Sequence, residues 1–373
     1  SIYILHSTVF GGVMMELYIF DRDLNFQGIL ESFFSLRWIR RYSKCGEFEL
    51  HCSLTPEILE LLKKDNVIWK KDDLEAGYIE YRNLRQDTEG KEVMVVKGKF
   101  LTGYLGRRII WGTENLSTTA ELAMRQLINN HAINPANTDR KIDMLTLGDL
   151  KGYTNNIDKQ VSYKNLLETI EEIANTNELG IRTLIDIQNK QMIFDIYEGT
   201  NRTAEQSENA PAIFSREFEN VLEQEYTDSF NNYRNTVLVA GEGEGATRKI
   251  VTVGEGAGFD RYELFIDARD LQQEDMTNEE YEAVLVDRGQ SKLAETKEIQ
   301  TFESKININS NLTYKEDFDL GDMVTCVSKK WGITIDTRIT EIEEVYEENG
   351  FSANITFGNN IPTLIDKIKQ VVR

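Results

Sequence analysis

The sequence predicts a mainly β protein, built from antiparallel sheets with α+β insertions. Apolar and polar residues alternate in three consecutive runs near the C-terminus, Met323–Lys329, Ile333–Ile342 and Phe351–Phe357. Alternation at period two indicates strands with one buried and one solvated face. Asn349-Gly350 lies between the last two runs, and this dipeptide suits a tight hairpin. Capped helical stretches elsewhere in the chain interrupt similar β patterns.

The N-terminal third predicts hairpins and strands around one short helix. The helix begins at Thr55-Pro56, because proline suits the first helical position, and its apolar residues between 58 and 62 face inward. The expected β elements are a hairpin within Glu16–Ile29, a second hairpin from Phe34–Tyr42 and Gly46–Cys52, and the strands Asn66–Lys70, Gly77–Arg85 and Glu92–Phe100.

The middle of the chain changes to mixed α and β patterns. Thr118 and Glu121 have the spacing of a capping box, which predicts a helix to about Asn130. Apolar residues at helical spacing predict a second helix. The further elements expected are this helix over Tyr163–Ala174, a hairpin of Ile181–Ile187 and Gln191–Tyr197, and a polar domain junction at Glu198–Asn209.

β patterns return in the last part of the chain. Thr277 and Glu280 form a second capping-box pattern, which predicts a helix to about Thr296. The remaining elements expected are a strand over Ser215–Tyr226, a hairpin of Arg234–Ala240 with Arg248–Val253, a strand over Glu298–Asn307, and a terminal helix from Pro362 to Val372.

Composition indicates a globular, acidic chain of two or three domains. Its 373 residues are 40% hydrophobic, with four prolines and a net charge of -21. Such acidity argues against nucleic acid as a partner, because duplex binding depends on basic side chains. No apolar run reaches the length of a membrane span. Three cysteines without a CxxC motif indicate reduced thiols and assembly in a cytoplasm, with Cys52 and Cys326 pointing into cores.

Two glycine-rich and acidic patterns resemble ligand sites but lack essential parts. Gly241, Gly243 and Gly245 follow a strand, yet a strand and not a helix follows them, so we interpret this loop as a hairpin rather than a dinucleotide site. We expect the loop Gly241–Thr247 to be exposed and mobile. Asp21-x-Asp23-x-Asn25 begins like a calcium loop, but the required glycine and later acidic residue are absent.

The remaining chemical candidates do not form a catalytic pattern. Adjacent glutamates such as Glu171-Glu172 and Glu343-Glu344 are expected to be mostly solvated. His51 is expected on the wet face of a strand, and no histidine has metal-ligand spacing. A nucleophilic pair of Cys45 or Cys52 with His131 stays open as a minor alternative. We therefore assign no catalytic, cofactor-binding or metal-binding residue, and no cofactor.

Large aromatic residues allow two interpretations. They could stack against a sugar as a binding platform, or they could anchor a core or a subunit interface, and we favour the second. The residues concerned are Trp38, Tyr42, Trp69, Trp111 and Trp331.

Several blocks together resemble one known family. They are ELYIFDRDLNFQGILE, WIRRYSKCGEFELHC, GYLGRRIIWGTENL, SREFENVLEQEYTDSFNNYRN and the C-terminal meander. The chain from about Met15 to its end resembles the tail hub proteins, or minor tail-tip proteins, of siphophages and prophages of Gram-positive hosts. These are distantly similar to the baseplate hub of contractile-tailed phages.

The resemblance implies a structural virion protein of the tail tip, not an enzyme. Hubs of this family look like trimers in which each subunit contributes two β-barrel domains similar to the tail-tube fold. The implied partners are two further copies, the hexameric tail tube, distal tail proteins, and a downstream tail fibre or lysin. The rival interpretations are a tail-associated cell-wall hydrolase and a wall-carbohydrate-binding tail protein.

These considerations divide the chain into six segments. Residues 1–14 are expected to be a tag or upstream extension. The others are a first β-barrel domain at 15–110, an α/β domain at 111–205, an inserted set of hairpins and a helix at 206–297, a second β-barrel region at 298–361 and a C-terminal helix at 362–373.

Overall fold

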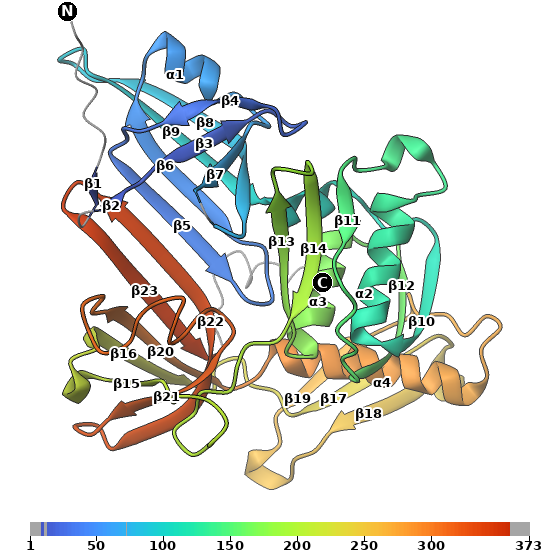
Figure 1. Ribbon diagram of the computed structural model, residues 1–373. Helices are drawn as coiled ribbons and strands as arrows, with labels where there is room; N and C mark the ends of the chain where they lie inside the picture. Colours follow the sequence, from blue (N-terminus) through green and yellow to red (C-terminus); the bar gives the residue numbers. More distant parts are fainter. Residues whose placement is uncertain (1–8, 11–12, 72, 359–373) are drawn as a thin grey trace, which may run out of the picture.

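The computed structural model describes residues 9–10, 13–71 and 73–358, and Figure 1 shows their arrangement. A first β unit (residues 17–100) and a second β unit (residues 213–229 and 299–358) lie side by side. An α/β unit (residues 101–197) packs beside them, and an inserted unit (residues 236–295) lies beneath it in this view. The expected terminal helix from Pro362 lies outside the described residues, as do most of residues 1–14.

The first β unit follows the predicted hairpins closely. Thr55 caps its one helix by accepting a hydrogen bond from the backbone N–H of Ile58, and Pro56 occupies the first turn. Its elements are β3 (Leu17–Phe20), β4 (Phe26–Leu30), β5 (Ser35–Arg41), β6 (Glu47–Ser53), α1 (Pro56–Leu61), β7 (Val67–Lys70), β8 (Ala76–Gln86) and β9 (Glu92–Phe100). A two-residue pair, β1 (Val9–Phe10) with β2 (Val13–Met14), precedes them.

The α/β unit shares one hydrophobic core with the first β unit, running from Leu17 to Ile196. Its strands form two small sheets, β10 with β12 and β11 with β14 and β13. Its elements are the 3-10 helix η1 (Leu101–Arg107), β10 (Thr113–Thr119), α2 (Ala120–Ile128), the π-helical turn η2 (Asn129–Ile133), η3 (Thr138–Arg140), β11 (Leu145–Leu147), β12 (Asn156–Ser162), α3 (Leu166–Thr176), β13 (Gly180–Asp186) and β14 (Gln191–Tyr197).

Two predictions for this unit were wrong in detail. The cap of α2 is Thr119 and not Thr118, and Glu121 instead accepts hydrogen bonds from the backbone N–H groups of residues 151–153. Glu121 therefore fastens a neighbouring loop and does not close a capping box. Tyr163 lies before α3 at a positive φ of 50° and is 69% exposed, so it is not on the buried face of that helix.

The second β unit is interrupted by the inserted unit. Its elements are β15 (Ile213–Ser215), η4 (Arg216–Phe218), β16 (Val221–Ser229), β20 (Ile299–Ile306), β21 (Met323–Ser328), β22 (Ile333–Glu347) and β23 (Gly350–Gly358). The predicted strand Ser215–Tyr226 is in fact two strands, because η4 and Glu219, at a φ of 57°, turn the chain between them. β15 pairs with β21 and β16 pairs with β20, so both lie with the second β unit.

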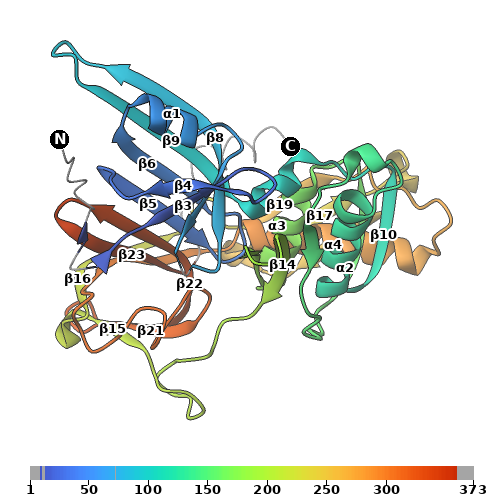
Figure 2. The ribbon, with the colours of Figure 1, turned by 45° about the horizontal axis from the view of Figure 1, so that its top comes forward.

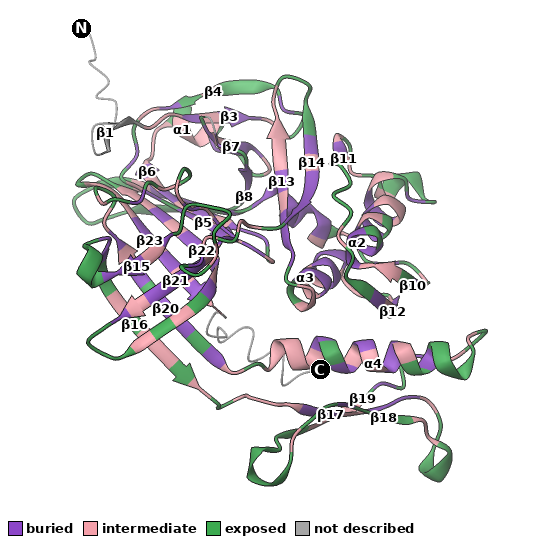
Figure 3. Cartoon of the chain, turned by 60° about the horizontal axis from the view of Figure 1, so that its bottom comes forward, coloured by how far each residue is buried: buried purple, intermediate pink, exposed green. Residues whose placement is uncertain are grey.

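The inserted unit has its own small core. The helix α4 (Asn278–Glu295) begins with the predicted capping box of Thr277 and Glu280 and covers one face of a three-stranded sheet. Figure 3 shows α4 running along that sheet. The remaining elements are β17 (Thr236–Ala240), η5 (Gly245–Thr247), β18 (Ile250–Gly254), η6 (Gly258–Asp260) and β19 (Glu263–Asp267), of which the last was not predicted.

Within the described residues, one continuous sheet of 13 strands links the two β units. In the first unit its strand order includes β5-β6-β9-β8-β7, and in the second β16-β20-β23-β22-β21. The two orders match strand for strand, and the strands also occur in the same sequence along the chain. The predicted mainly β fold with α+β insertions is confirmed. Neither half closes into a barrel within the described residues, so the two barrel domains stay a prediction.

Candidate functional site: the junction between the two β units

The two β units are joined by direct backbone pairing of β5 with β22. Pairs run from Arg41 opposite Glu341 to Glu347 opposite Ser35. The first half of β22 pairs with β21 of its own unit and the second half pairs with β5, so this single strand connects the two β units. A shared strand holds the two units at a fixed angle more firmly than side-chain contacts alone, because its hydrogen bonds are directional.

Charged residues on the outer face of the junction match across the strands. Arg41 Nε lies 2.8 Å from the Glu341 carboxylate directly opposite, and Arg41 Nη2 lies 2.7 Å from Glu47. Arg37 pairs with Glu343. These side chains are partly solvated, so each pair contributes at most about 1 kcal/mol. Opposite charges across the strands support the pairing of β5, which carries the arginines, with β22, which carries the glutamates.

The inner face of the junction buries a charged network. Trp38 stands opposite Glu344, and both side chains are fully buried. The Lys70 ammonium group, from β7, pairs with Glu344 and lies 2.8 Å from Asp73 Oδ2. It also lies 5.3 Å from the centre of the Trp38 ring. Buried charges persist only when they are paired, and here Lys70 forms an ion pair with both carboxylates.

The ionisation of this network follows from its pairing. Burial alone would raise the pKa of Asp73, but Lys70 and Lys315 outweigh it and hold the pKa well below its usual range. Burial alone would likewise raise the pKa of Glu344. The positive charge of Lys70 outweighs burial, so the pKa of Glu344 is lowered. Lys70 itself has a raised pKa, because Asp73 and Glu344 outweigh its burial. The three groups therefore remain charged at neutral pH.

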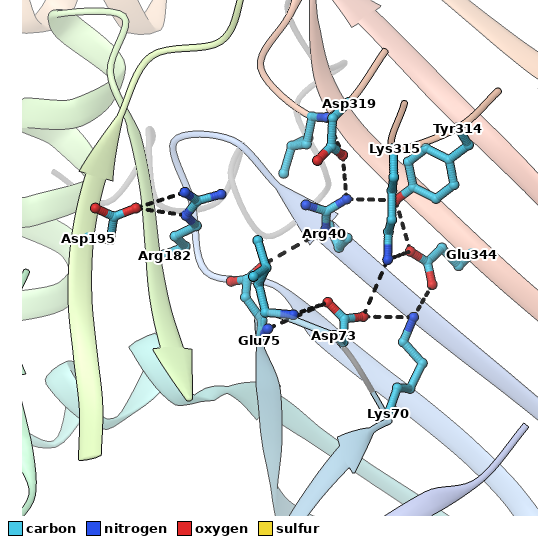
Figure 4. A network of polar contacts seen from close by, with 12 residues as sticks. Arg40, Lys70, Asp73, Glu75, Arg182, Asp195, Tyr314, Lys315, Asp319 and Glu344 are labelled. Carbon is cyan, nitrogen blue, oxygen red and sulfur yellow. Dashed lines mark hydrogen bonds and ion pairs between the residues drawn. The ribbon is translucent and has the colours of Figure 1, made fainter. Parts of the chain in front are cut away.

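A loop of the second β unit closes the network from the other side, as Figure 4 shows. Lys315 Nζ lies 3.8 Å from Asp73 and 3.7 Å from Glu344. Arg40 Nη1 donates hydrogen bonds of 2.6 Å to the Tyr314 hydroxyl and to Asp319. This loop lies between β20 and β21, the position that α1 and its flanking residues occupy between β6 and β7.

The α/β unit meets the same network beside Glu75, which lies between β7 and β8 of the first β unit. The Glu75 carboxylate lies 3.8 Å from Arg40 Nε, and the Glu75 backbone bridges to Leu184 of β13 in the α/β unit. Burial raises the pKa of Glu75 to about 7, although Arg40 opposes the shift. Figure 4 shows Arg182 and Asp195 beside this contact, and their ion pair measures 2.9 Å. Three units of the chain thus converge on one cluster of charges.

Sequence reasoning missed most of this site. Glu344 was expected to be solvated with its neighbour Glu343, and it is fully buried instead. Glu172, another member of an adjacent pair, is also largely buried, against Lys159 at 2.8 Å. Both corrections have one cause: a lysine from a separate strand reaches the carboxylate. A signal for Glu344 existed, since it occupies the inward phase of an alternating strand.

The cysteine and histidine candidates are not brought together. The three cysteines are buried free thiols, which confirms the core positions of Cys52 and Cys326. Cys45 Sγ faces the carbonyl oxygens of Gly46 and Phe100, and burial raises its pKa. His131 is buried and its Nε2 lies 3.0 Å from Glu114. The structure therefore does not form the Cys–His pair considered from the sequence.

The other candidates have structural roles. Asp21 Oδ1 accepts hydrogen bonds from the backbone N–H groups of Asp23 and Asn25, which is a turn and not a calcium loop. His51 Nε2 lies 2.6 Å from Glu49 on a partly solvated face. The loop of residues 243–247 is exposed, as expected, whereas Gly241 is buried against Tyr281. The mobility of this loop stays a prediction.

The large aromatic residues do not share one surface. Trp38 and Tyr42 are buried, Trp69 is partly buried, and Trp111 and Trp331 are 51% and 47% exposed. A common sugar platform is therefore not formed by these five residues. No group of three or more metal-ligating side chains gathers within the described residues. Among those same residues, no helix combines the length and apolar character needed to cross a membrane.

Comparison with known proteins places this geometry in a family. The model of siphovirus ReqiPepy6 Gp37-like proteins matches residues 16–359. The chain belongs to this family. No curated protein sequence matches it.

Solved structures of prophage tail proteins share the fold over nearly the whole chain. Prophage tail protein gp18 from Listeria monocytogenes EGD-e has a TM-score of 0.56 at 12% identity, covering 96% of this chain and 98% of its own. The 43 kDa tail protein of prophage MuSo2 from Shewanella oneidensis has a TM-score of 0.56 at 14% identity, covering 92% and 98%. A tail protein from Neisseria meningitidis MC58 gives 0.55 at 10% identity, covering 93% and 97%.

The resemblance to phage tail proteins inferred from the sequence is confirmed by these matches. The similar structures are named as tail proteins. The absence of catalytic, cofactor-binding and metal-binding residues stays a prediction. The Gram-positive host stays a prediction.

Proposed function

We propose that the chain is a structural tail hub protein that acts as a trimer and joins the hexameric tail tube to the tail tip or baseplate. Its family and its fold support a structural role in the tail. The observation that carries the finer proposal is the repeated strand order of the two β units. A threefold assembly can match a sixfold ring only if each copy offers two similar surfaces.

The junction supports this role because it fixes the two surfaces relative to each other. Backbone pairing of β5 with β22 sets their register, and the network around Lys70 and Glu344 buries charges that cannot separate cheaply. A hub that transmits force between tube and tip requires such a fixed angle. In this proposal, buried ion pairs occupy the place of an apolar interface, and they specify a single orientation of the two β units.

The oligomeric state tests the proposal most directly. Light scattering on the purified full chain, and on tails assembled from it, is expected to show three copies. A stable dimer or tetramer under assembly conditions would contradict the hub. Labelling of assembled tails is expected to place the protein at the tip of the tube, with the chain made in the host cytoplasm. Label along the whole tube would contradict that position.

The hydrolase and carbohydrate-binding alternatives have separate tests. Zymography on bacterial cell walls is expected to show no clearing by the purified chain. Clear lysis that is abolished by a single Glu→Gln substitution would show that the chain is a hydrolase and would contradict the proposed hub. A glycan array is expected to show no specific wall-sugar binding, since a hub needs none.

A further inference from the structure

One half of a strand in the first β unit is left without a partner. β8 pairs with β7 only from Ala76 to Tyr78, and its second half pairs with β9 alone within the described part of the chain. Residues Tyr81–Gln86 are almost all exposed. Figure 2 shows the hairpin of β8 and β9 projecting beyond the rest of the unit. An exposed strand edge is a template for pairing with another chain.

The equivalent strand of the second β unit has the partner that β8 lacks. β22 pairs first with β21 and then, in its second half, with β5 as well as β23. The change of partner occurs at a bulge in both units, between Ile79 and Tyr81 in β8 and between Ile339 and Glu341 in β22. β8 therefore has the geometry of β22 without the added strand.

Backbone hydrogen bonds show which residues of β8 and β22 are equivalent. The N–H of Asp65 donates to the carbonyl of Ile79, and the N–H of Ile79 donates to Asn66. The N–H of Gly321 donates to Ile339 in the same way, and that of Ile339 donates to Asp322, all four at 2.9 Å. Asp65 and Gly321 both have positive φ, 67° and 93°. Ile79 and Ile339 are thus equivalent positions.

The second β unit has an open edge as well, at β16, which is the strand equivalent to β5. β16 pairs with β20 as β5 pairs with β6, and a cross-strand aromatic pair occurs at the same place in each, Trp38–Phe48 and Tyr226–Phe302. The other edge of β16 has no partner among the described residues. β16 therefore stands in the second unit where β5 stands in the first, but without a strand to join. Figure 3 shows exposed and half-buried residues along it.

We propose that β16 of one copy pairs with the open half of β8 of a second copy, and so repeats the junction of β5 with β22 between chains. This inference rests on the proposed threefold hub for the closure of the ring. The equivalences predict the register. Arg41 opposite Glu341 becomes Ser229 opposite Tyr81, and Trp38 opposite Glu344 becomes Tyr226 opposite Leu84.

The charges along the two edges are complementary in this register. Glu225 would stand opposite Arg85, and Asp228 opposite Arg82. Arg85 and Glu225 are exposed, whereas Arg82 is partly engaged by the carbonyls of Leu59 and Leu62, 3.2 Å from its Nη1. In the strongly acidic chain, two arginines opposite two carboxylates favour this pairing, and opposite charges across strands stabilise a sheet. A second copy therefore fits the edge.

The geometry of the repeated contact determines whether the assembly closes into a ring. The pairing is head-to-tail, since β16 and β8 are different surfaces, and such a contact forms a closed ring or an open filament. If the new junction has the angle of the internal one, each chain advances the ring by two equal steps. In the proposed threefold hub, three chains then make six equal steps and close the ring.

Disulfide cross-linking tests the register. Tyr226→Cys in one copy and Leu84→Cys in another stand opposite each other, within the span of a disulfide. Mixed single variants, oxidised in solution and in assembled tails, are expected to give a covalent pair. The doubly substituted chain is expected to give species that stop at three copies. Tyr226→Cys with Arg85→Cys is the matched control, because a shift of one residue puts the side chains on opposite faces.

Charge reversal tests the same contact without cysteines. Glu225→Arg or Arg85→Glu alone is expected to weaken assembly by about tenfold, and both together to restore it to near the native level. Arg261→Glu, at an exposed pair with Glu263 on the inserted unit, is the control and is expected to leave assembly unchanged. Failure of the double variant to recover would overturn the pairing.

The outcomes separate this inference from the proposed function. A trimer without the Tyr226–Leu84 cross-link, or with the shifted cross-link, overturns the edge pairing and leaves the hub intact. Cross-linked chains that grow past three copies support the pairing and overturn the threefold ring. A chain that is monomeric and uncross-linked, both alone and in tails, overturns both.

Discussion

The two β units have the same strand order but differ in how complete their edges are. In the second unit, β22 has received β5, and the contact is closed by the buried charges of Lys70, Asp73 and Glu344. In the first unit, the equivalent half of β8 is mostly exposed, and its side chains are mainly polar apart from Leu84. One scaffold can therefore carry a completed interface within the chain and an open copy of it for another chain.

The connections differ as well. The first unit uses α1 between β6 and β7, whereas the second uses the loop that contains Tyr314 and Lys315. That loop contributes the Lys315 cation and the Tyr314 hydroxyl to the internal junction, whereas α1 and its C-cap offer carbonyl groups to Arg82 near the open edge. The inserted unit lies between β16 and β20, where it interrupts the chain without changing their pairing. The sheet thus stays constant while its connections diverge.

Breaking the buried network should have the largest effect. Lys70→Met leaves two buried carboxylates near each other, so we expect a loss of about 3–5 kcal/mol of folding free energy. Thermal unfolding of the full chain measures it. Lys71→Met, at a half-exposed neighbour, is the control and should cost less than about 1 kcal/mol. Equal losses for the two variants would show that the network does not hold the units together.

A core position distinguishes the units nearly as strongly. Phe357 stands opposite Ile339 and Phe302, and the equivalent residue opposite Ile79 and Phe48 is Gly98. Phe357→Ala should cost about 3–5 kcal/mol, because its side chain is fully buried.

The reverse change should also destabilise, although it adds only a methyl group. A Cβ at Gly98 would lie 1.8 Å from the Tyr78 carbonyl oxygen, so Gly98→Ala forces the backbone apart. Thermal unfolding compares both variants with Phe26→Ala, at a side chain that is 57% exposed. A harmless Gly98→Ala would mean that the first unit tolerates the packing of the second.

The junction should also respond to pH through Glu75. Its pKa of about 7 in the folded chain lies above the ordinary value of 4.5, so the folded state holds a proton that the unfolded chain releases. The stability that this proton contributes is present below about pH 4.5 and is lost as the pH rises through 7. Glu75→Gln should therefore stabilise the chain at pH 8, by at most about 3 kcal/mol, and leave it unchanged at pH 4.5.

Melting temperatures across this pH range measure the effect, with Glu89→Gln in an exposed turn as the control. Arg40 keeps Asp319 and Tyr314 as partners in the Glu75→Gln variant, so the substitution does not leave it unpaired. A constant difference between variant and native chain at every pH would contradict a titrating Glu75.

Local patterns in the sequence predicted elements, and distant contacts escaped them. The meander of β21, β22 and β23 was predicted, because alternation and the Asn349-Gly350 turn act within a few residues. The Thr277–Glu280 box marked α4 for the same reason. The pairing of Arg41 with Glu341 joins residues 300 positions apart, and no local pattern reports it. The burial of the charges in the site depends on that pairing, so the sequence did not predict it either.

The smallest effect should come from exchanging the two left-handed residues before β7 and β21. Asp65→Gly relieves the positive φ of an L-residue but removes a 2.5 Å contact with Arg107, and these effects nearly cancel, within about 1 kcal/mol. Gly321→Asp is not equivalent, because a Cβ there would lie 2.5 Å from the Tyr42 ring, so it should cost at least about 1–3 kcal/mol. Thermal unfolding compares the two.

The asymmetry would show that the internal junction has packed around Gly321, whereas the equivalent turn beside the open edge still has room for a side chain. Equal costs would mean that both turns are equally enclosed, and that the open edge differs from the internal junction only in its missing strand.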